Sequence, residues 1–309
     1  MIITAAGLSK NFGSTQALRG VSCEVGAGAT GLLGPNGAGK TTFLRILLGL
    51  LSAEGEARVL GVDPMRRPLD VRARVGYMPE SECIIAGLHA LDVVAYMGRL
   101  SGLPRRDAFK RAHEVLYYVG LGEERYRDAT GFSMGMQQRL KLATALVHDP
   151  ALLLLDEPTN GLDPSGRVEM LELVSDLAHD HGKNVLLSSH LLRDVEQVCS
   201  QVVVFDEGRL VRVEDLDALA AAAPTACFEV DVRGDWAAFL ESLEELGGRP
   251  DESDTERFRV LLPDGADASM IFRAARSSGT QVRGLQATVK SLEDVFFESV
   301  NSEGAGHGS

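Results

Sequence analysis

The sequence predicts an α/β domain built on a largely parallel sheet, followed by a smaller α+β domain at the carboxyl end. Short, continuous apolar runs alternate with helix-like segments through the first two-thirds of the chain, as in sheets buried on both faces. The charge divides the chain in the same way, because nearly all of the net charge of −13 falls after residue 213. We therefore expect a first domain over residues 1–220, an accessory domain over 225–300 and a disordered tail over 301–309.

The first functional motif is the segment GPNGAGKT at residues 34–41, which matches the phosphate-binding loop pattern G-x-x-x-x-G-K-[ST]. A buried strand is expected before it, over 30–33, and a helix after it, over 42–48. Glycines let backbone N–H groups turn toward phosphate oxygens, and a helix N-terminus adds positive partial charge. We expect Lys40 to reach the β- and γ-phosphates and the Thr41 hydroxyl to bind Mg²⁺. The other nucleotide contacts expected here are Gly34, Pro35, Asn36, Gly37, Ala38, Gly39 and Thr42.

A second apolar run, over residues 152–155, ends in Asp156 and Glu157. Four apolar residues without alternation favour a strand buried on both faces, and open α/β sheets bind ligands at the carboxyl ends of such strands. We expect Asp156 to hold Mg²⁺ and Glu157 to polarise the water that attacks the γ-phosphate. The alternative is a strand followed by a solvated acidic turn, which the phosphate loop in the same chain disfavours.

Between these motifs, residues 132–139 read FSMGMQQR and resemble the signature of the ATP-binding subunits of ABC transporters. Met134 stands where the commonest form of that family has Gly, and this variant is similar to the drug-resistance branch of bacterial export ATPases. Ser133 and Gly135 precede a helix expected from about Gln137 to His148, where a hydroxyl and bare amides form an anion site. The resemblance implies that this site, with Gln137 counted among the ATP-binding residues, clamps ATP held by the opposite subunit.

The resemblance extends to three further positions. It implies that Phe12 stacks on adenine, although a core phenylalanine is the alternative. Residues 160–164, including Asp163, match the loop that crosses the dimer interface. His190 follows an expected buried strand at 185–189 and matches the switch histidine that contacts the γ-phosphate.

One position departs from the family pattern. Glu80 follows the expected strand 75–78 at the place where the family usually has Gln, which touches Mg²⁺ and faces the membrane subunit. A glutamate accepts a metal contact but donates no hydrogen bond. Similar export ATPases carry Glu here, so we count Glu80 among the expected metal ligands and leave its exact role open.

The fold implied by the resemblance is a P-loop NTPase of the ABC ATPase type. A helical subdomain is expected over about residues 85–150, where apolar residues recur at helical spacing between 88 and 120. A hairpin is expected around residues 206–208. In the accessory domain we expect strands at 227–232, 258–262 and 282–289, a helix at 236–246, and a last helix from a capping box at 291–294 through Val300.

The resemblance implies an ATP-hydrolysing exporter subunit that uses ATP and Mg²⁺, works as a head-to-tail homodimer, and drives a separate multi-span membrane permease. No apolar run approaches the roughly 20 residues that span a bilayer, and no signal peptide is visible, so we expect a peripheral protein on the cytoplasmic side of the membrane. The acidic excess of the last third of the chain argues against DNA or anionic lipid as a partner of that part, although solubility alone is the favoured explanation for it. We expect no nucleic acid partner. The four cysteines, Cys23, Cys83, Cys199 and Cys227, lack C-x-x-C spacing, which indicates reduced thiols and no zinc site.

Two other functions stay open from the sequence. A soluble ABC ATPase could act on the ribosome, DNA or an assembly scaffold, but such chains usually show two phosphate loops or long coiled-coil inserts, and neither is visible here. A regulatory ATP-binding module is disfavoured by Glu157 and His190. The transported substrate, the identity of the membrane partner and the direction of transport are not encoded in these motifs.

Overall fold

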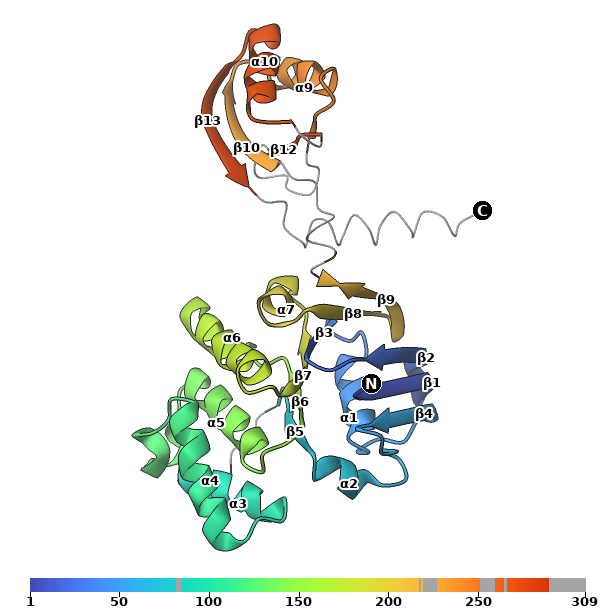
Figure 1. Cartoon of the computed structure of the whole chain (residues 1–309), viewed down its shortest axis with the longest axis vertical. Helices are drawn as coiled ribbons and strands as arrows, with labels where there is room; N and C mark the ends of the chain where they lie inside the picture. The colour runs from blue at the N-terminus through green and yellow to red at the C-terminus, as the bar shows by residue number, and fades with distance from the viewer. Residues whose placement is uncertain (82–84, 217, 219–226, 251–258, 264–265, 289–309) are drawn as a thin grey trace. The chain divides into compact units, whose positions relative to one another are not determined.

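The computed structural model describes the chain except residues 82–84, 217, 219–226, 251–258, 264–265 and 289–309 (Figure 1). The chain divides into two compact units, Met1–Leu216 and Asp217–Ser309. Each unit has a hydrophobic core of its own. Cys83, the expected boundary between the two domains at residues 220–225, the expected last helix and the tail all lie outside the described residues.

The first unit is built around a six-stranded sheet with the order β5-β6-β7-β3-β8-β9. Neighbouring strands from β5 to β8 pair in parallel, whereas β9 pairs antiparallel with β8, which confirms the expected hairpin. Every residue of β3 and β6 is buried, which is why these strands appear in the sequence as unbroken apolar runs. The strands are β3 (Ala29–Leu33), β5 (Val75–Met78), β6 (Leu152–Asp156), β7 (Asn184–Ser189), β8 (Gln201–Asp206) and β9 (Arg209–Asp215).

A second, antiparallel sheet with the order β2-β1-β4 was not expected from the sequence. Its strands are β1 (Ile3–Phe12), β2 (Thr15–Val25) and β4 (Glu54–Val59). The phosphate-loop helix α1 (Lys40–Leu47) buries Phe43, Leu44, Ile46 and Leu47 in one core shared with both sheets. A short helix, α2 (Pro68–Arg72), precedes β5. The start of α1 is thus fixed between the two sheets.

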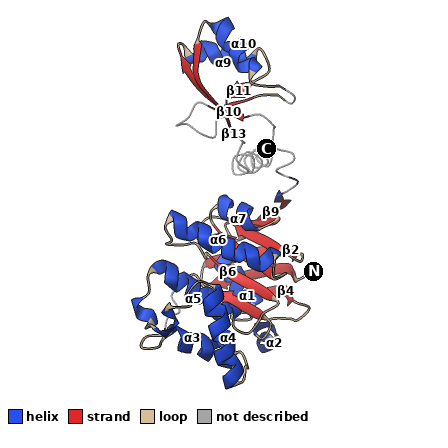
Figure 2. Cartoon of the chain, turned by 60° about the vertical axis from the view of Figure 1, so that its left-hand side comes forward, coloured by secondary structure: helices blue, strands red, loops and turns tan. Residues whose placement is uncertain are grey.

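The expected helical insert is confirmed by α3 (Ala90–Leu100) and α4 (Arg105–Tyr118), followed by the short turns η1 (Glu124–Tyr126) and η2 (Ala129–Gly131). Figure 2 shows α3, α4 and α5 grouped beside the strands of this unit. The remaining helices are α5 (Met134–Leu146), α6 (Pro164–His179) and α7 (Leu192–Val198). Among the described residues, no helix is both long and apolar enough to cross a membrane.

The expected start of α5 was wrong by three residues. The Ser133 side chain caps the helix by accepting a hydrogen bond from the backbone N–H of Met136, so the helix begins at Met134. Gly135 therefore lies inside the first turn rather than before the helix. The helix also ends at Leu146, before His148.

The described residues of the second unit have the element order β-α-β-β-α-β and the sheet order β11-β12-β10-β13, with each of these neighbouring pairs antiparallel, as in ferredoxin-like folds. Phe239, Leu243, Val260 and Ile271 form the centre of its core. The expected strands and the helix at 236 are confirmed, but α10 and β11 were not anticipated. The elements are β10 (Cys227–Arg233), α9 (Trp236–Glu244), β11 (Arg249–Pro250), β12 (Arg259–Leu261), α10 (Ser269–Ser278) and β13 (Gln281–Thr288).

Candidate nucleotide site

The loop between β3 and α1 passes so close to other backbone that two of its positions accept only glycine. A Cβ atom on Gly34 would lie 2.2 Å from the carbonyl oxygen of Phe205. Gly39 has a φ of +104°, and a Cβ atom there would lie 2.7 Å from the carbonyl oxygen of Ala17. The loop borders a cavity of about 380 Å³, lined by Ala17, residues 35–42, Glu80 and Glu157.

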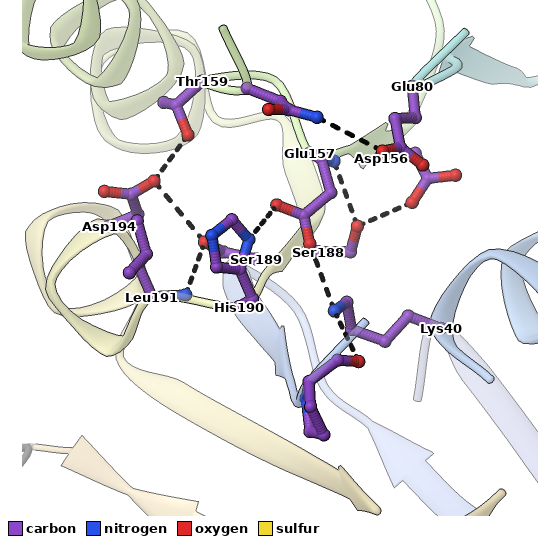
Figure 3. Close-up of polar contacts among 12 residues, drawn as sticks. Lys40, Glu80, Asp156, Glu157, Thr159, Ser188, Ser189, His190, Leu191 and Asp194 are labelled. Carbon is purple, nitrogen blue, oxygen red and sulfur yellow. Dashed lines mark hydrogen bonds and ion pairs between the residues drawn. The ribbon is translucent and has the colours of Figure 1, made fainter. Parts of the chain in front are cut away.

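A chain of three charged or titratable side chains starts at this cavity, which Lys40 and Glu157 line, and continues to His190 (Figure 3). The Lys40 ammonium lies 3.1 Å from Oε1 of Glu157 and also donates to the carbonyl oxygens of Gly34, at 2.5 Å, and Pro35, at 3.3 Å. Oε2 of Glu157 lies 2.9 Å from Nδ1 of His190. The side chains of Lys40 and Glu157 are only 6% and 5% exposed, so their charges are weakly screened by water.

Glu157 has a left-handed backbone, with φ of +50°. Such a conformation costs a non-glycine residue on the order of 1–3 kcal/mol and persists only where its surroundings enforce it. Here the Glu157 N–H donates to both Oγ and the carbonyl oxygen of Ser188, at 3.1 and 3.2 Å. The strained residue is the one expected to activate water. Its backbone conformation directs the carboxylate toward Lys40 and His190.

Asp156 lies at the end of β6 with no exposed surface. Its Oδ1 accepts from Ser188 Oγ at 2.8 Å and from Thr41 Oγ1 at 3.2 Å, and its Oδ2 accepts from the Tyr77 hydroxyl at 3.3 Å. Burial, and then the Asp156 carboxylate, raise the pKa of Tyr77 to about 12, so Tyr77 keeps the proton that it donates.

The oxygen atoms of Thr41 and Asp156 fit a Mg²⁺ ion that arrives with a nucleotide. Mg²⁺ in proteins is usually held by one or two carboxylates together with phosphate oxygens and water. Over the described parts of the chain, no group of three or more His, Cys, Asp or Glu side chains is placed to hold a metal ion. The adjacent hydroxyl and carboxylate therefore supply part of a coordination shell that phosphate oxygens would complete.

The signature residues lie in a different place from the phosphate loop. Ser133, Gly135 and Asp163 border a second cavity, of about 500 Å³, which shares no lining residue with the first. Asp163 caps α6 by accepting from the N–H of Gly166 at 2.9 Å. Gln137 does not border this cavity, because its side-chain amide donates to the carbonyl oxygen of Phe132 at 3.1 Å. Within one copy of the chain, the expected ATP residues at these cavities are thus divided between two separate places.

Phe12 and Glu80 complete the set of expected residues. The Phe12 side chain is 49% exposed at the end of β1, so it is not a core residue, and the Lys10 ammonium lies 5.3 Å from the centre of its ring. Glu80 borders the first cavity, and its Oε1 accepts from Nδ2 of Asn160 at 3.2 Å.

Several buried polar residues around the site were missed by the sequence reading. Ser188 joins Asp156 to the backbone of Glu157, as described above. Asp194 is 2% exposed and accepts from Thr159 Oγ1 at 2.5 Å and from Ser189 Oγ at 3.4 Å, which ties the segment after Glu157 to the loop of His190. Ser188 and Asp194 each stand next to an apolar residue in the sequence, and a polar residue in such a place was the signal that could have identified them.

The comparisons with known proteins agree with this geometry. A family model described as ABC transporter matches residues 18–160. The chain is 35% identical over 303 residues to an uncharacterized ABC transporter ATP-binding protein, YxlF, of Bacillus subtilis (strain 168), covering 97% of this chain and 100% of that protein. It is also 35% identical over 302 residues to the daunorubicin resistance ATP-binding protein DrrA2 of Streptomyces coeruleorubidus, covering 96% of this chain and 94% of that protein.

A solved structure supports the same assignment. A bacterial ABC transporter cassette with a dimeric structure matches with a TM-score of 0.63 and 25% identity, over 69% of this chain and 98% of that chain. The chain therefore belongs to the family of ABC transporter ATP-binding proteins, which bind and hydrolyse ATP.

Proposed function

We propose that this chain is the ATP-hydrolysing subunit of an ABC exporter of the drug-resistance branch. The observation that carries the proposal is the buried Lys40–Glu157 ion pair at the cavity bordered by the phosphate loop, with His190 in contact with Glu157 and with Asp156 in contact with Thr41. Relatives such as DrrA2 are named for resistance to a drug, which supports export as the direction of transport.

The residues have distinct roles in the proposed reaction. Lys40 and the loop amides bind the β- and γ-phosphates, while Phe12 stacks on the base. Thr41 and Asp156, together with Glu80, hold Mg²⁺, which supplies positive charge to the phosphate oxygens when bound. Glu157 accepts the proton of the attacking water, and His190, 2.9 Å away, reports the presence of the γ-phosphate.

Two copies of the chain complete each other in this proposal. The cavity at Lys40 and the cavity at Ser133 belong to one chain but share no lining residue, which suits a site that a second copy completes. A head-to-tail dimer would bring Ser133, Gly135 and the Asp163 loop of one copy to the γ-phosphate held by the other. The dimeric structure of the related cassette supports this arrangement.

We further propose that a multi-span membrane permease binds an apolar groove of the first unit, which places the protein at the cytoplasmic face of the membrane. The groove has a volume of about 700 Å³ and lies among α2, β5, α3, the segment after α1 and the carboxyl end of α5. Leu50, Leu69 and Leu100 border it and are 48%, 73% and 65% exposed, an unusual exposure for three neighbouring leucines. A short apolar segment of the permease would cover them.

The test replaces Glu157 by Gln, which keeps the size of the side chain but removes the base. We expect hydrolysis to fall by at least roughly 100-fold, since general bases contribute 10²–10⁴-fold, and ATP to hold the protein as a dimer in size-exclusion chromatography. Glu172→Gln, at an exposed position of α6, is the matched control and should behave like the parent. Normal steady-state hydrolysis by the Glu157→Gln variant would contradict the proposal.

The same variant identifies the partner. Tagged Glu157→Gln protein, recovered from detergent-solubilised membranes with ATP present, should carry a multi-span membrane protein at equal stoichiometry. Adding Leu69→Asp to the groove should release that protein without preventing ATP-dependent dimerisation. Recovery of ribosomal or other soluble partners instead would favour the soluble ABC ATPase and leave the ATPase chemistry intact.

A further inference from the structure

The helix α5 carries two buried polar side chains one turn apart that the proposed reaction does not use. Gln138 and Lys141 are 3% and 4% exposed. Buried polar groups are costly unless they are hydrogen-bonded, so their partners indicate what they hold in place.

Lys141 holds the backbone around Glu80. Its ammonium donates to the carbonyl oxygens of Pro79 at 2.8 Å, Glu80 at 3.0 Å and Ser81 at 3.4 Å. An ammonium group has three N–H donors, and three consecutive carbonyl oxygens accept hydrogen bonds from it here. The segment that follows β5 is thereby fixed to α5, although the two are about sixty residues apart in the chain.

Gln138 and Asn160 close a ring of contacts around the same glutamate. The Gln138 amide donates to the carbonyl oxygen of Asn160 at 2.9 Å, and the Asn160 amide donates to Oε1 of Glu80 at 3.2 Å (Figure 3 shows the contact at Glu80). Asn160, in the loop after Glu157, thus holds the carboxylate of Glu80, while Lys141 holds the backbone of Glu80. Both supports originate on α5.

This ring sets a third carboxylate at the phosphate cavity. Glu80 and Glu157 border the cavity, and Asp156 contacts Thr41 at its edge, whereas Lys40 is the lysine that lines it. Three carboxylates beside one ammonium repel a polyphosphate unless a cation accompanies it. Glu80 therefore offers that cation a charged ligand at the position where the family usually has an uncharged glutamine.

We propose that Lys141 is a positioning residue that fixes Glu80 as an acidic ligand for the cation bound with the nucleotide. The N-terminal end of α5 lies at the cavity bordered by Ser133. One helix therefore connects the proposed metal site of its own subunit to the cavity that would face the ATP of a partner subunit. The inference rests on the proposed function, because it assumes that the cavity receives a nucleotide.

The test measures nucleotide binding rather than turnover. In the Glu157→Gln background, binding of a fluorescent ATP analogue is titrated with MgCl₂, and the half-saturating Mg²⁺ concentration is compared among variants. Lys141→Met and Glu80→Gln should each raise this concentration roughly ten-fold, within the 10–100-fold range typical of residues that orient metal ligands. Lys141→Arg should restore part of the loss, because it keeps the donors.

A double-mutant cycle separates positioning from a general effect on folding. If Lys141 acts through Glu80, Lys141→Met should add nothing in a Glu80→Gln background, whereas independent, additive effects would overturn the inference. Lys183→Met is the matched control: that lysine also donates to a carbonyl oxygen, of Pro150 at 3.0 Å, but lies outside the cavity, and its loss should leave the Mg²⁺ requirement unchanged.

If Lys141→Met does not fold, Asn160→Ala tests the same ring from its other side and should also raise the Mg²⁺ requirement. An unchanged requirement in the folded variants overturns the inference alone. Failure of the Glu157→Gln parent to bind the nucleotide at any Mg²⁺ concentration would instead overturn the proposed function.

Discussion

At the scale of single residues, the site depends on side chains that hold the reactive groups as much as on the reactive groups themselves. Ser188 is fully buried and contacts both acidic residues: its hydroxyl donates to Asp156 and accepts from the N–H of Glu157. One hydroxyl therefore sets the relative position of the metal carboxylate and the proposed base.

Replacing Ser188 by Ala tests this role. The change removes a donor from a buried carboxylate, which should destabilise the fold by about 1–3 kcal/mol and lower kcat because the strained backbone of Glu157 loses one of its two partners. Urea unfolding and steady-state ATP hydrolysis measure the two effects. Ser175→Ala, at the exposed face of α6, is the control. An unchanged kcat with a lowered stability would mean that Ser188 is structural only.

The sequence predicted the residues at the ends of buried strands but not those that act across the fold. Lys40, Asp156 and Glu157 follow continuous apolar runs, so their place at one edge of a parallel sheet could be inferred. Lys141 and Asp194 act on segments 61 and 35 residues away, at Glu80 and Thr159, and no local pattern encodes such pairs.

At the scale of elements, the same distinction separates the strands that were predicted from those that were not. The three strands of the antiparallel sheet were missed because β1 contains register shifts after Ala5, Leu8 and Lys10, which break the period of two. The helix α10 was missed because two of its four buried positions, Ala274 and Ala275, are small and weaken the apolar stripe. The start of α5 required the cap contact at Ser133, which sequence spacing alone did not place.

The contact between α5 and β5 predicts a pH dependence of stability. His148, two residues after α5, places Nε2 3.3 Å from the carbonyl oxygen of Val75. Burial lowers the pKa of His148 below its ordinary value of 6.5, so the folded protein keeps it neutral when the unfolded chain is protonated. Its stabilising contribution is therefore complete above about pH 6.5 and is lost as the pH falls.

The urea midpoint at pH 7.5 and at pH 5.5 measures this loss. We expect the drop between the two values to be smaller in His148→Gln, which keeps a donor near Val75 but cannot be protonated in this range. A drop of equal size in the parent and the variant would show that other groups dominate the acid sensitivity.

At the scale of the whole molecule, the two units divide the chain into a part that carries every expected site residue and a part that carries none. The first unit shares one core between both of its sheets and α1. The second unit has its own core around Phe239, whose ring stacks on Trp236 at 5.2 Å. Because each core, over the residues that the structure describes, is built from its own unit, each unit should unfold cooperatively by itself.

Differential scanning calorimetry of the full chain should therefore show two transitions that respond to different changes. ATP with Mg²⁺ should raise the free energy of unfolding of the first unit only, by about 2.7 kcal/mol when ATP is present at 100 times its Kd. Phe239→Ala should lower the free energy of unfolding of the second unit only, by about 3–5 kcal/mol, because the Phe239 side chain has no exposed surface. Phe272→Ala, 53% exposed on α10, should shift neither transition. If Phe239→Ala lowered the temperature of the nucleotide-sensitive transition as much as that of the other transition, the two cores would fold as one. The second unit would then contribute directly to the stability of the ATP site.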